Sequence, residues 1–357
     1  MDSHVQGDKN RLSFGEILEQ LLNIEGRSGE EREVLLWIAS FLQKCGFRDL
    51  YWQEYQLGKW NLYARRGYSP FLFAGHVDVH YVDREPGFFC RNGFAFGAGV
   101  LDARGQIASL LYALSQFHGP VEVVFFSEEE TSGAGSWNFV PPHPFEGAIV
   151  LEPTSFALCT AFAGDVEVQM KIEGLGGHGA CPLLGKNALD IGWKIVEESR
   201  RIVNSLAPHP LFVPPLQLMW GKMEGGESSY VIPGCCVIQC AFPFPPPYSV
   251  EEMRDAVLGL QDRYPVTIVV EDENPAWELK TEETMVQRLK EAVERVTHQE
   301  CVYGGMPSWT DATYLFLKGV KSVVFGAGDL ALAHSRRESV SVEELERLSG
   351  IFLSFLR

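Results

Sequence analysis

The stretch of residues 70–105 constrains the fold of this 357-residue chain more than any other part of the sequence. Within it, the apolar run 71–74 has the length and composition of a buried strand, and His76 follows shortly after. The glycine-rich turn 97–105 carries Asp102 and opens onto an apolar, helix-like segment. Metal sites on open α/β sheets are built from such strand ends and turns. A histidine after a strand is usually structural, but the two features together indicate a metal site.

The same turn does not match the dinucleotide-binding fingerprint, because Asp102 occupies the place of its third glycine. Three more apolar runs read as strands that end at polar residues: 121–126, 147–151 and 322–325. Strands that alternate with helices at this spacing predict an α/β fold with a mostly parallel sheet covered by helices.

The alternation of single strands with helices gives way to a different order of elements between residues 163 and 274. There the order of expected elements is β-α-β-β-α-β, which is the split ferredoxin-like arrangement and can form a small α+β domain of its own. We therefore expect a catalytic domain made of residues 12–162 and 275–357, with residues 163–274 inserted as a second domain.

Four Ser-x-x-Glu patterns predict helix starts, because each residue of a capping box can bind the backbone N–H of the other. They begin at Ser13, Ser28, Ser249 and Ser341. The second pattern predicts that Ser28 and Glu31 cap an amphipathic helix ending near Gly46.

Composition excludes several classes of partner. The formal charge of −17 argues against nucleic acid and anionic membranes, and it leaves room for carboxylates that hold cations. No apolar run approaches the length of a membrane span, and the N-terminus lacks a signal-peptide core. The eight cysteines are scattered without CxxC pairs, so we expect reduced thiols and a cytoplasmic location.

Five potential metal ligands each lie just beyond an expected strand or in the loop that follows it. They are His76, Asp102, Glu130, Glu152 and His334. Two imidazoles and three carboxylates fit a pair of divalent ions, most naturally zinc, with cobalt and manganese as alternatives. Glu129 is the available general base. Asp78 is placed to bind the second ring nitrogen of His76.

Six motifs along the chain resemble those of the M20 family of metallopeptidases and deacylases. They are HVDV, GAGVLDARG, EEETSGAG, LEPT, GGHGACP and FGAGDLALAH, and the resemblance extends from about residue 13 to the end. The resemblance implies that Asp102 bridges two metals. It assigns His76 and Glu152 to one metal and the remaining two ligands to the other, with Glu129 as the base.

The resemblance also implies a role for the inserted domain. In the family this domain is a lid and usually supplies a homodimer interface. His178 matches the lid histidine, which stabilises the oxyanion in a family active site and often comes from the partner subunit. The sequence context alone would instead favour a structural turn histidine.

Some positions depart from the family pattern. Tyr230 replaces a common asparagine, and Pro243 stands where an arginine usually meets the substrate carboxylate. Arg104, Arg336 or Arg337 are alternatives for that contact. Asp311 resembles an aspartate near the family's substrate pocket.

The resemblance predicts a dinuclear-metal amidohydrolase that cleaves the amide bond of an N-acyl amino acid, similar to acetylornithine or acetyllysine deacetylases. The alternative is a di- or aminopeptidase acting on short peptides. A catalytically silent binding protein is less compatible with an intact ligand set, because a buried carboxylate cluster is costly without a cation.

Overall fold

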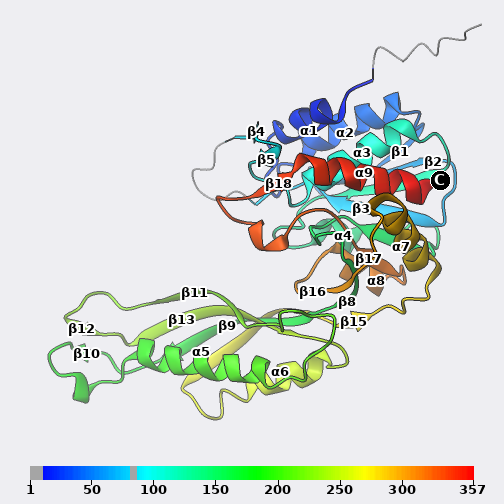
Figure 1. Ribbon diagram of the computed structural model, residues 1–357. Helices are drawn as coiled ribbons and strands as arrows, with labels where there is room; N and C mark the ends of the chain where they lie inside the picture. Colours follow the sequence, from blue (N-terminus) through cyan, green and yellow to red (C-terminus); the bar gives the residue numbers. More distant parts are fainter. Residues whose placement is uncertain (1–10, 81–86) are drawn as a thin grey trace, which may run out of the picture. The chain divides into compact units, whose positions relative to one another are not determined.

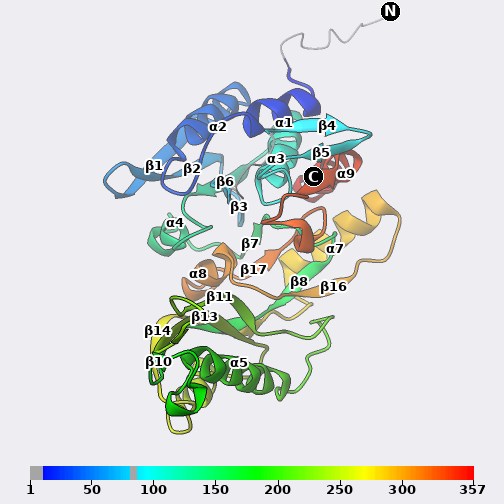
Figure 2. The same ribbon diagram turned by 90° about the vertical axis from the view of Figure 1, so that its left-hand side faces the viewer.

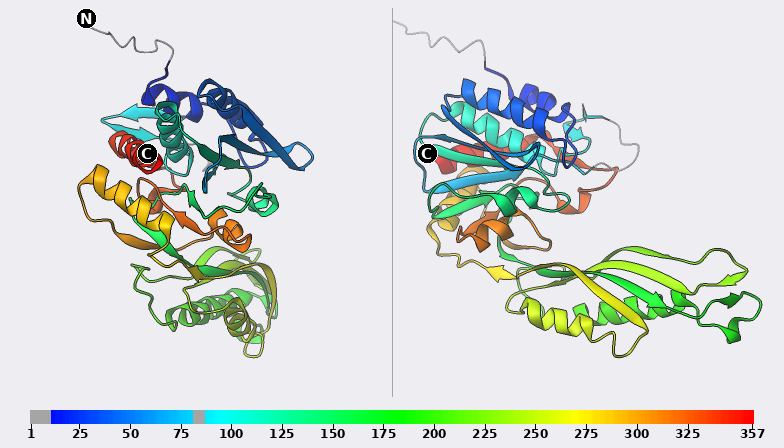
Figure 3. Two further views of the ribbon diagram at one scale, coloured as in Figure 1. Left: turned by 90° about the vertical axis from the view of Figure 1, so that its right-hand side faces the viewer. Right: turned by 180° about the vertical axis from the view of Figure 1, so that it is seen from behind.

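The computed structural model describes residues 11–80 and 87–357, which form two compact units. The first unit contains residues up to Thr160, together with Leu279–Tyr303 and Thr310–Arg357. The second contains Ala161–Glu278 and Gly304–Trp309. Figures 1 to 3 show the elements of each unit from four sides.

The large mixed sheet has the strand order β1-β2-β6-β3-β7-β17-β8-β15, and β16 pairs with β8. Most of its strands belong to the first unit, whereas β15, most of β16 and the end of β8 belong to the second. The strands are β1 (Asp49–Gln56), β2 (Lys59–Arg66), β3 (Phe71–His76), β6 (Val121–Phe126), β7 (Gly147–Val150), β8 (Leu158–Phe162), β15 (Trp277–Glu278), β16 (Tyr303–Met306) and β17 (Ser322–Val324). The pairs β6/β3, β3/β7 and β7/β17 are parallel, whereas β1/β2, β2/β6, β17/β8 and β8/β15 are antiparallel. The expected parallel sheet is therefore the central part of a mixed one.

Helices cover both faces of this sheet. The helices of the first unit are α1 (Phe14–Leu22), α2 (Arg32–Lys44), α3 (Arg104–Gln116), α4 (Ala134–Asn138), α7 (Thr284–Thr297), α8 (Asp311–Leu317) and α9 (Val342–Leu356), with the short 3₁₀ helix η2 (Leu330–Leu332). Figure 2 shows α1, α3 and α9 on one face and α4 and α8 on the other. Strands β3, β6, β7 and β17 are buried along their whole length, as parallel strands under two helical layers must be. A small sheet, β18-β5-β4, is made of Ser339–Ser341, Phe94–Phe96 and Phe89–Arg91.

The second unit has the ferredoxin-like order expected from the sequence. Its main elements are β9 (Gly164–Glu173), α5 (Ala188–Asn204), β11 (Met219–Gly225), β13 (Cys235–Phe244), α6 (Val250–Leu258) and β14 (Val266–Asn274). The four strands form an antiparallel sheet in the order β11-β13-β9-β14. The inward-facing residues of β9, which include Val166, Val168, Met170 and Ile172, are fully buried against α5 and α6. The strands β10 (Gly177–His178) and β12 (Val231–Ile232) pair separately near the 3₁₀ helix η1 (Pro182–Leu184).

The boundary differs from the expected one by a few residues at 161–162 and 275–278, and most clearly at residues 304–309, which the sequence assigns to the catalytic domain. In the structure they group with the second unit. The N–H of Ala163 donates to the Met306 carbonyl at 3.0 Å, and a Cβ on Gly305 would lie only 2.7 Å from the Phe212 ring. These contacts hold the segment against the second unit.

None of the helices in the described part of the chain is long and apolar enough to cross a bilayer.

One local prediction is wrong, and one of the three arginines named for the substrate carboxylate is buried. Ser13 and Ser249 do form capping boxes, but Ser28 and Glu31 do not cap α2, which begins without a side-chain cap bond. The Ser28 hydroxyl instead donates to Asp78, and the Glu31 carboxylate accepts the N–H groups of Gly29 and Glu128. Arg104 is 1% exposed, so it is unsuited to binding a substrate carboxylate from solvent. Its guanidinium donates to the carbonyls of Val77, Ile24 and Gly26.

We predict that Arg104→Lys lowers the free energy of unfolding of the first unit by at least about 2 kcal/mol, because an ammonium cannot reach all the carbonyls that the guanidinium fork satisfies. Denaturant unfolding followed by circular dichroism measures this. Arg65→Lys, on an exposed arginine 3.0 Å from Asp49, is the control and should change little. An unshifted midpoint for Arg104→Lys would contradict the prediction.

Candidate metal centre

The parallel strands of the first unit place their carboxyl ends, and the loops that follow, at one edge of the sheet. β3 ends at His76, and the loop after β6 carries Glu129 and Glu130. Glu152 follows β7, and His334 lies in the loop after β17. Parallel pairing of β3 with β6 and β7 aligns these ends, which is where ligands gather in open sheets.

Two groups of three side chains share Asp102. In the first, His76 Nε2 lies 3.0 Å from Asp102 Oδ1 and 3.6 Å from Glu152 Oε1. In the second, His334 Nε2 lies 2.7 Å from Glu130 Oε2 and 3.4 Å from Asp102 Oδ2. The candidate ligand atoms of each group lie within 4.8 Å of one another. The structure thus brings together the five side chains chosen from the sequence, with one carboxylate oxygen of Asp102 facing each imidazole.

The chemistry of this cluster fits divalent cations. Within the described residues, Glu130 Oε1 and Glu152 Oε1 are buried and accept no hydrogen bond. Burial raises the pKa of Glu152 well above its ordinary value, and the charge of Asp102 adds to the effect. Burial also opposes ionisation of Asp102, but hydrogen bonds from His334 and His76 hold its pKa below the usual range. Cations between these groups would relieve the repulsion and satisfy the free oxygens.

His334 has the most exposed side chain of the cluster, at 49%. Hydrogen bonds to Asp102 and Glu130 raise its pKa to about 10. Its backbone has a positive φ of 52°, an uncommon conformation for a non-glycine residue that recurs at functional sites.

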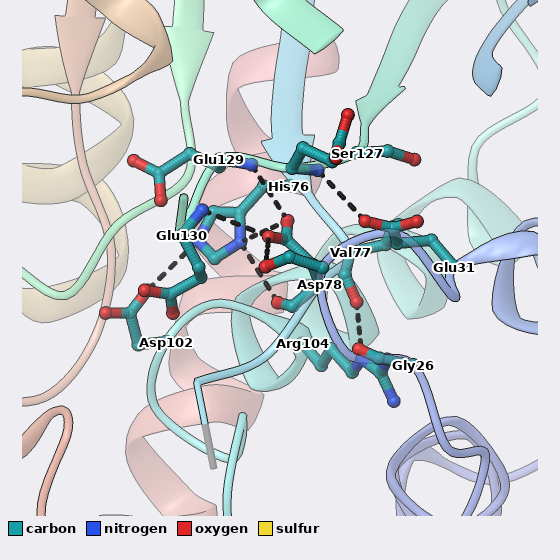
Figure 4. A network of polar contacts seen from close by, with 12 residues as sticks. Gly26, Glu31, His76, Val77, Asp78, Asp102, Arg104, Ser127, Glu129 and Glu130 are labelled. Carbon is teal, nitrogen blue, oxygen red and sulfur yellow. Dashed lines mark hydrogen bonds and ion pairs between the residues drawn. The ribbon is translucent and has the colours of Figure 1, made fainter. Parts of the chain in front are cut away.

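Asp78 connects the ligand His76 to the loop that carries Glu129 and Glu130. Its carboxylate Oδ1 lies 3.5 Å from His76 Nδ1, and its backbone carbonyl is 3.2 Å from the same nitrogen. The carboxylate also accepts the N–H groups of Glu129 at 3.1 Å and Glu130 at 3.0 Å. Ser28 donates its hydroxyl to Asp78 at 2.7 Å. Figure 4 shows Asp78 between His76 and this loop.

The Glu129 carboxylate extends away from Asp78 in Figure 4. Burial raises its pKa well above the ordinary value, and the charges of Asp311, Glu130 and Asp102 add to this. Asp311 is itself fully buried, and neither of its oxygens has a hydrogen-bond partner within the described residues. Burial raises the pKa of Asp311 to about 7, against the opposing effect of His76.

Sequence reasoning missed a residue that orients Asp102. Glu338 is 4% exposed, and its Oε1 accepts the N–H groups of Leu101 at 3.0 Å and Asp102 at 3.2 Å. It lies 236 positions along the chain from Asp102, and no local pattern marks it. Gln106 similarly ties the Leu101 carbonyl to Ala327 in the loop after β17.

The remaining predicted residues belong to the second unit or are exposed. His178 lies on β10 with an exposed side chain, and its Nδ1 accepts the N–H of Ala180 at 3.1 Å. Pro243 lies on β13, and Tyr230 is 76% exposed. Arg336 and Arg337 are exposed on the loop that carries His334.

Comparison with known proteins identifies, along most of the chain, the family that the sequence motifs resemble. The sequence profile described as Peptidase family M20/M25/M40 matches residues 72–357. Acetylornithine deacetylase of Vibrio cholerae is 26% identical over 371 aligned positions, which cover 94% of this chain and 95% of that protein.

Solved structures share the fold at low sequence identity. An M20 family metallo-carboxypeptidase of Sulfolobus solfataricus has a TM-score of 0.77 at 14% identity, covering 97% of this chain and 99% of that one. A tripeptidase of Staphylococcus aureus has a TM-score of 0.76 at 16% identity, covering 97% and 98%.

We predict that Asp102→Ala lowers the metal content from about two divalent ions per chain to well below one, because both groups lose a ligand. Glu152→Ala and His334→Ala should each leave about one ion, because each removes a ligand from a single group. Elemental analysis after dialysis against micromolar zinc measures this, with Asp49→Ala as an exposed carboxylate control. Retention of two ions by Asp102→Ala would contradict the shared-ligand arrangement.

Proposed function

Because the chain belongs to peptidase family M20/M25/M40, we propose that it is a dinuclear-metal amidohydrolase that cleaves the amide bond of an N-acyl amino acid. The single observation that carries this proposal is the pair of three-residue groups sharing Asp102, with Glu129 beside them. The name of the Vibrio cholerae relative, acetylornithine deacetylase, supports an acylated amino acid as the substrate class.

His76 and Glu152 would hold one cation, Glu130 and His334 the other, and Asp102 both. Zinc suits this mixture of imidazole and carboxylate ligands, with cobalt and manganese as alternatives. When bound, two such cations lower the pKa of the attacking water and stabilise negative charge on the substrate carbonyl oxygen. Asp78 fixes the orientation of His76, because it engages the ring nitrogen that faces away from Asp102.

Glu129 acts as the proton carrier. Its carboxylate takes a proton from the water as the new C–O bond forms at the amide carbon. It then gives that proton to the amide nitrogen as the C–N bond breaks. The remaining proton of the attacking water also passes to the released nitrogen, so that a carboxylate and an ammonium group leave the site. The loop that holds Glu129 is fixed by Asp78 through two backbone N–H groups, so the carboxylate needs little reorganisation.

His178 donates to the oxyanion, and the second unit serves as the lid and as the interface of a homodimer. The family resemblance of its GGHGACP motif supports this role, as does the position of β11 at the edge of its sheet, where a further strand could pair. The side chain of His178 is exposed.

Arg336 and Arg337 are the remaining candidates for the substrate carboxylate. Pro243 has no donor there, and the guanidinium of Arg104 is buried among backbone carbonyls. Both candidates are exposed and lie within three residues of His334.

A di- or aminopeptidase is the second candidate function. The names of the two solved structures, a metallo-carboxypeptidase and a tripeptidase, favour it. At their 14% and 16% identity, however, the likeness shows the fold alone. A catalytically silent binding protein is a third candidate, which measurable turnover would exclude.

A screen of N-acyl amino acids and dipeptides on zinc- or cobalt-loaded protein tests the proposal. We expect release of acetate or another acyl acid from an acylated basic amino acid. Preferential release of amino acids from dipeptides would establish the peptidase instead. No turnover of either class at full metal content would support the binding protein.

We predict that Glu129→Gln lowers kcat by about 10²–10⁴-fold while the metal content stays at that of the wild type, because the amide cannot accept the proton. Glu130→Gln is the matched variant, one residue along the same loop, and should lose metal. Steady-state kinetics with elemental analysis separates the two. If Glu129→Gln instead loses metal and retains its rate per bound ion, the roles of the two glutamates are exchanged.

We predict that His178→Ala lowers kcat by about 10²–10³-fold, the cost of one oxyanion donor, without loss of metal. Light scattering first establishes whether the 39.9 kDa chain is a dimer. If His178 serves the partner's site, mixing His178→Ala with Glu129→Gln restores activity in hybrid dimers, because one site per hybrid keeps both groups. Confirmed subunit exchange without recovery would place His178 in its own subunit's site, and an unchanged kcat would make it a structural residue.

A further inference from the structure

Three consecutive backbone N–H groups in the loop after β6 are bound by two buried carboxylates. Glu31 Oε1 accepts the N–H of Glu128 at 3.0 Å. The two oxygens of Asp78 accept the next two N–H groups, those of Glu129 and Glu130. Figure 4 shows the carboxylates of Glu31 and Asp78 on one side of this loop and the Glu129 carboxylate extending to the other. These two carboxylates therefore fix the backbone that carries the general base, from the side opposite the Glu129 carboxylate.

The conformation held in this way is strained at one residue. Glu128 has a φ of 59°, in the left-handed region that a non-glycine residue rarely adopts. Its side chain is held from the β1–β2 hairpin, because Tyr55 donates its hydroxyl to Glu128 Oε2 at 2.9 Å and Lys59 forms an ion pair with Oε1. Contacts on both the backbone and the side chain therefore maintain this conformation.

The segment that carries Glu31 is itself anchored. Glu31 is 3% exposed, and its Oε1 also accepts the N–H of Gly29 at 2.7 Å, which closes a tight turn before α2. Ser28, in the same turn, donates to Asp78. The buried guanidinium of Arg104 binds the Gly26 carbonyl at 3.0 Å. A residue on this segment can therefore act as a fixed support for the loop after β6.

We propose that Glu31 is a positioning residue for the general base, acting through a single carboxylate oxygen that holds the N–H of Glu128 and keeps Glu129 directed at the reacting amide. This inference rests on the proposed function, in which Glu129 carries the proton. Both described contacts of the Glu31 side chain are with backbone N–H groups. Holding the loop therefore requires a hydrogen-bond acceptor at this position, and the oxygen of a neutral amide can provide it.

The test compares Glu31→Ala with Glu31→Gln in the full-length, metal-loaded protein. Loss of the acceptor in Glu31→Ala should lower kcat by about 10–100-fold, the scale for a small displacement of a catalytic group, with KM and metal content near those of the wild type. Glu31→Gln keeps a carbonyl oxygen and should restore kcat to within about threefold. Equal losses in both variants would overturn the inference, because the acceptor would then be insufficient.

Hydrogen exchange gives a readout that needs no substrate. In Glu31→Ala, peptides covering residues 127–133 should exchange about tenfold faster, the effect of losing one backbone hydrogen bond, and Glu31→Gln should reverse this. Unchanged exchange and unchanged kcat in Glu31→Ala would overturn the inference. A further outcome is that hydrogen exchange responds as expected although the wild type hydrolyses none of the screened amides. In that case the proposed function is wrong, whereas the inference that Glu31 supports the loop after β6 is retained.

Glu122→Ala is the matched control for loss of a buried carboxylate. Glu122 is fully buried near the other end of β6 and accepts the N–H of Ser69 at 2.9 Å. Its removal should destabilise the first unit without changing kcat per folded enzyme or the exchange of residues 127–133. An equal loss of kcat in this control would reduce the Glu31 effect to general destabilisation.

Tyr55→Phe keeps the inference testable if Glu31→Ala does not fold. It removes a single hydroxyl that holds Glu128 from the opposite side. We expect a smaller fall in kcat, about 2–10-fold, with faster exchange of the same peptides and unchanged metal content. A wild-type kcat with wild-type exchange would show that the conformation of Glu128 needs no such support, and would overturn the inference.

Discussion

A buried carboxylate that faces two imidazoles is the constraint on which the rest of this structure depends. Asp102 places one oxygen toward His76 and the other toward His334, and this requires three loops to approach one another closely. Repulsion among the surrounding carboxylates opposes that approach. The structure offsets it with backbone N–H groups that donate to Glu338 and Asp78, and with the imidazoles that hydrogen-bond to Asp102. Much of the polar interior of the first unit is arranged around this one residue.

The elements that the sequence predicts well are those whose signal is local. An apolar run followed by a histidine needs only its own neighbours to be recognised, and β3 ends at His76 as expected. The ferredoxin-like order of the second unit is likewise visible in the alternation of β9 and the helix spacing. The five candidate ligands were identifiable because every one of them follows a strand or precedes a helix, and the carboxyl ends of parallel strands meet at one edge.

The parts that sequence reasoning missed depend on contacts between distant residues. Glu338 binds backbone N–H groups more than two hundred residues away, and nothing beside it in the sequence distinguishes it from a surface glutamate. Ser28 and Glu31 carry a pattern that elsewhere in this chain does cap helices, yet here tertiary hydrogen bonds outweigh local capping. Arg104 follows the metal-site turn and carries a charge, but its burial among carbonyls is decided by the fold of residues 21–26. The local structure that a sequence pattern favours and the hydrogen bonds of the tertiary structure disagree most at the residues around the candidate site.

The inserted segment begins after β8 and ends at β15, and these two strands lie side by side. The chain leaves along β8 and returns along β15, with Phe162 opposite Trp277 in the antiparallel register and their rings stacked 3.7 Å apart. The ends of the insertion are therefore as close as those of a hairpin, and a short turn could join them without altering the order of any strand in the catalytic sheet. Such an attachment allows the segment between β8 and β15 to be exchanged, whereas residues 304–309 of the second unit lie elsewhere in the chain. Evolution can lengthen, replace or discard a segment of this kind in one step, while the strands that carry the ligands remain in register.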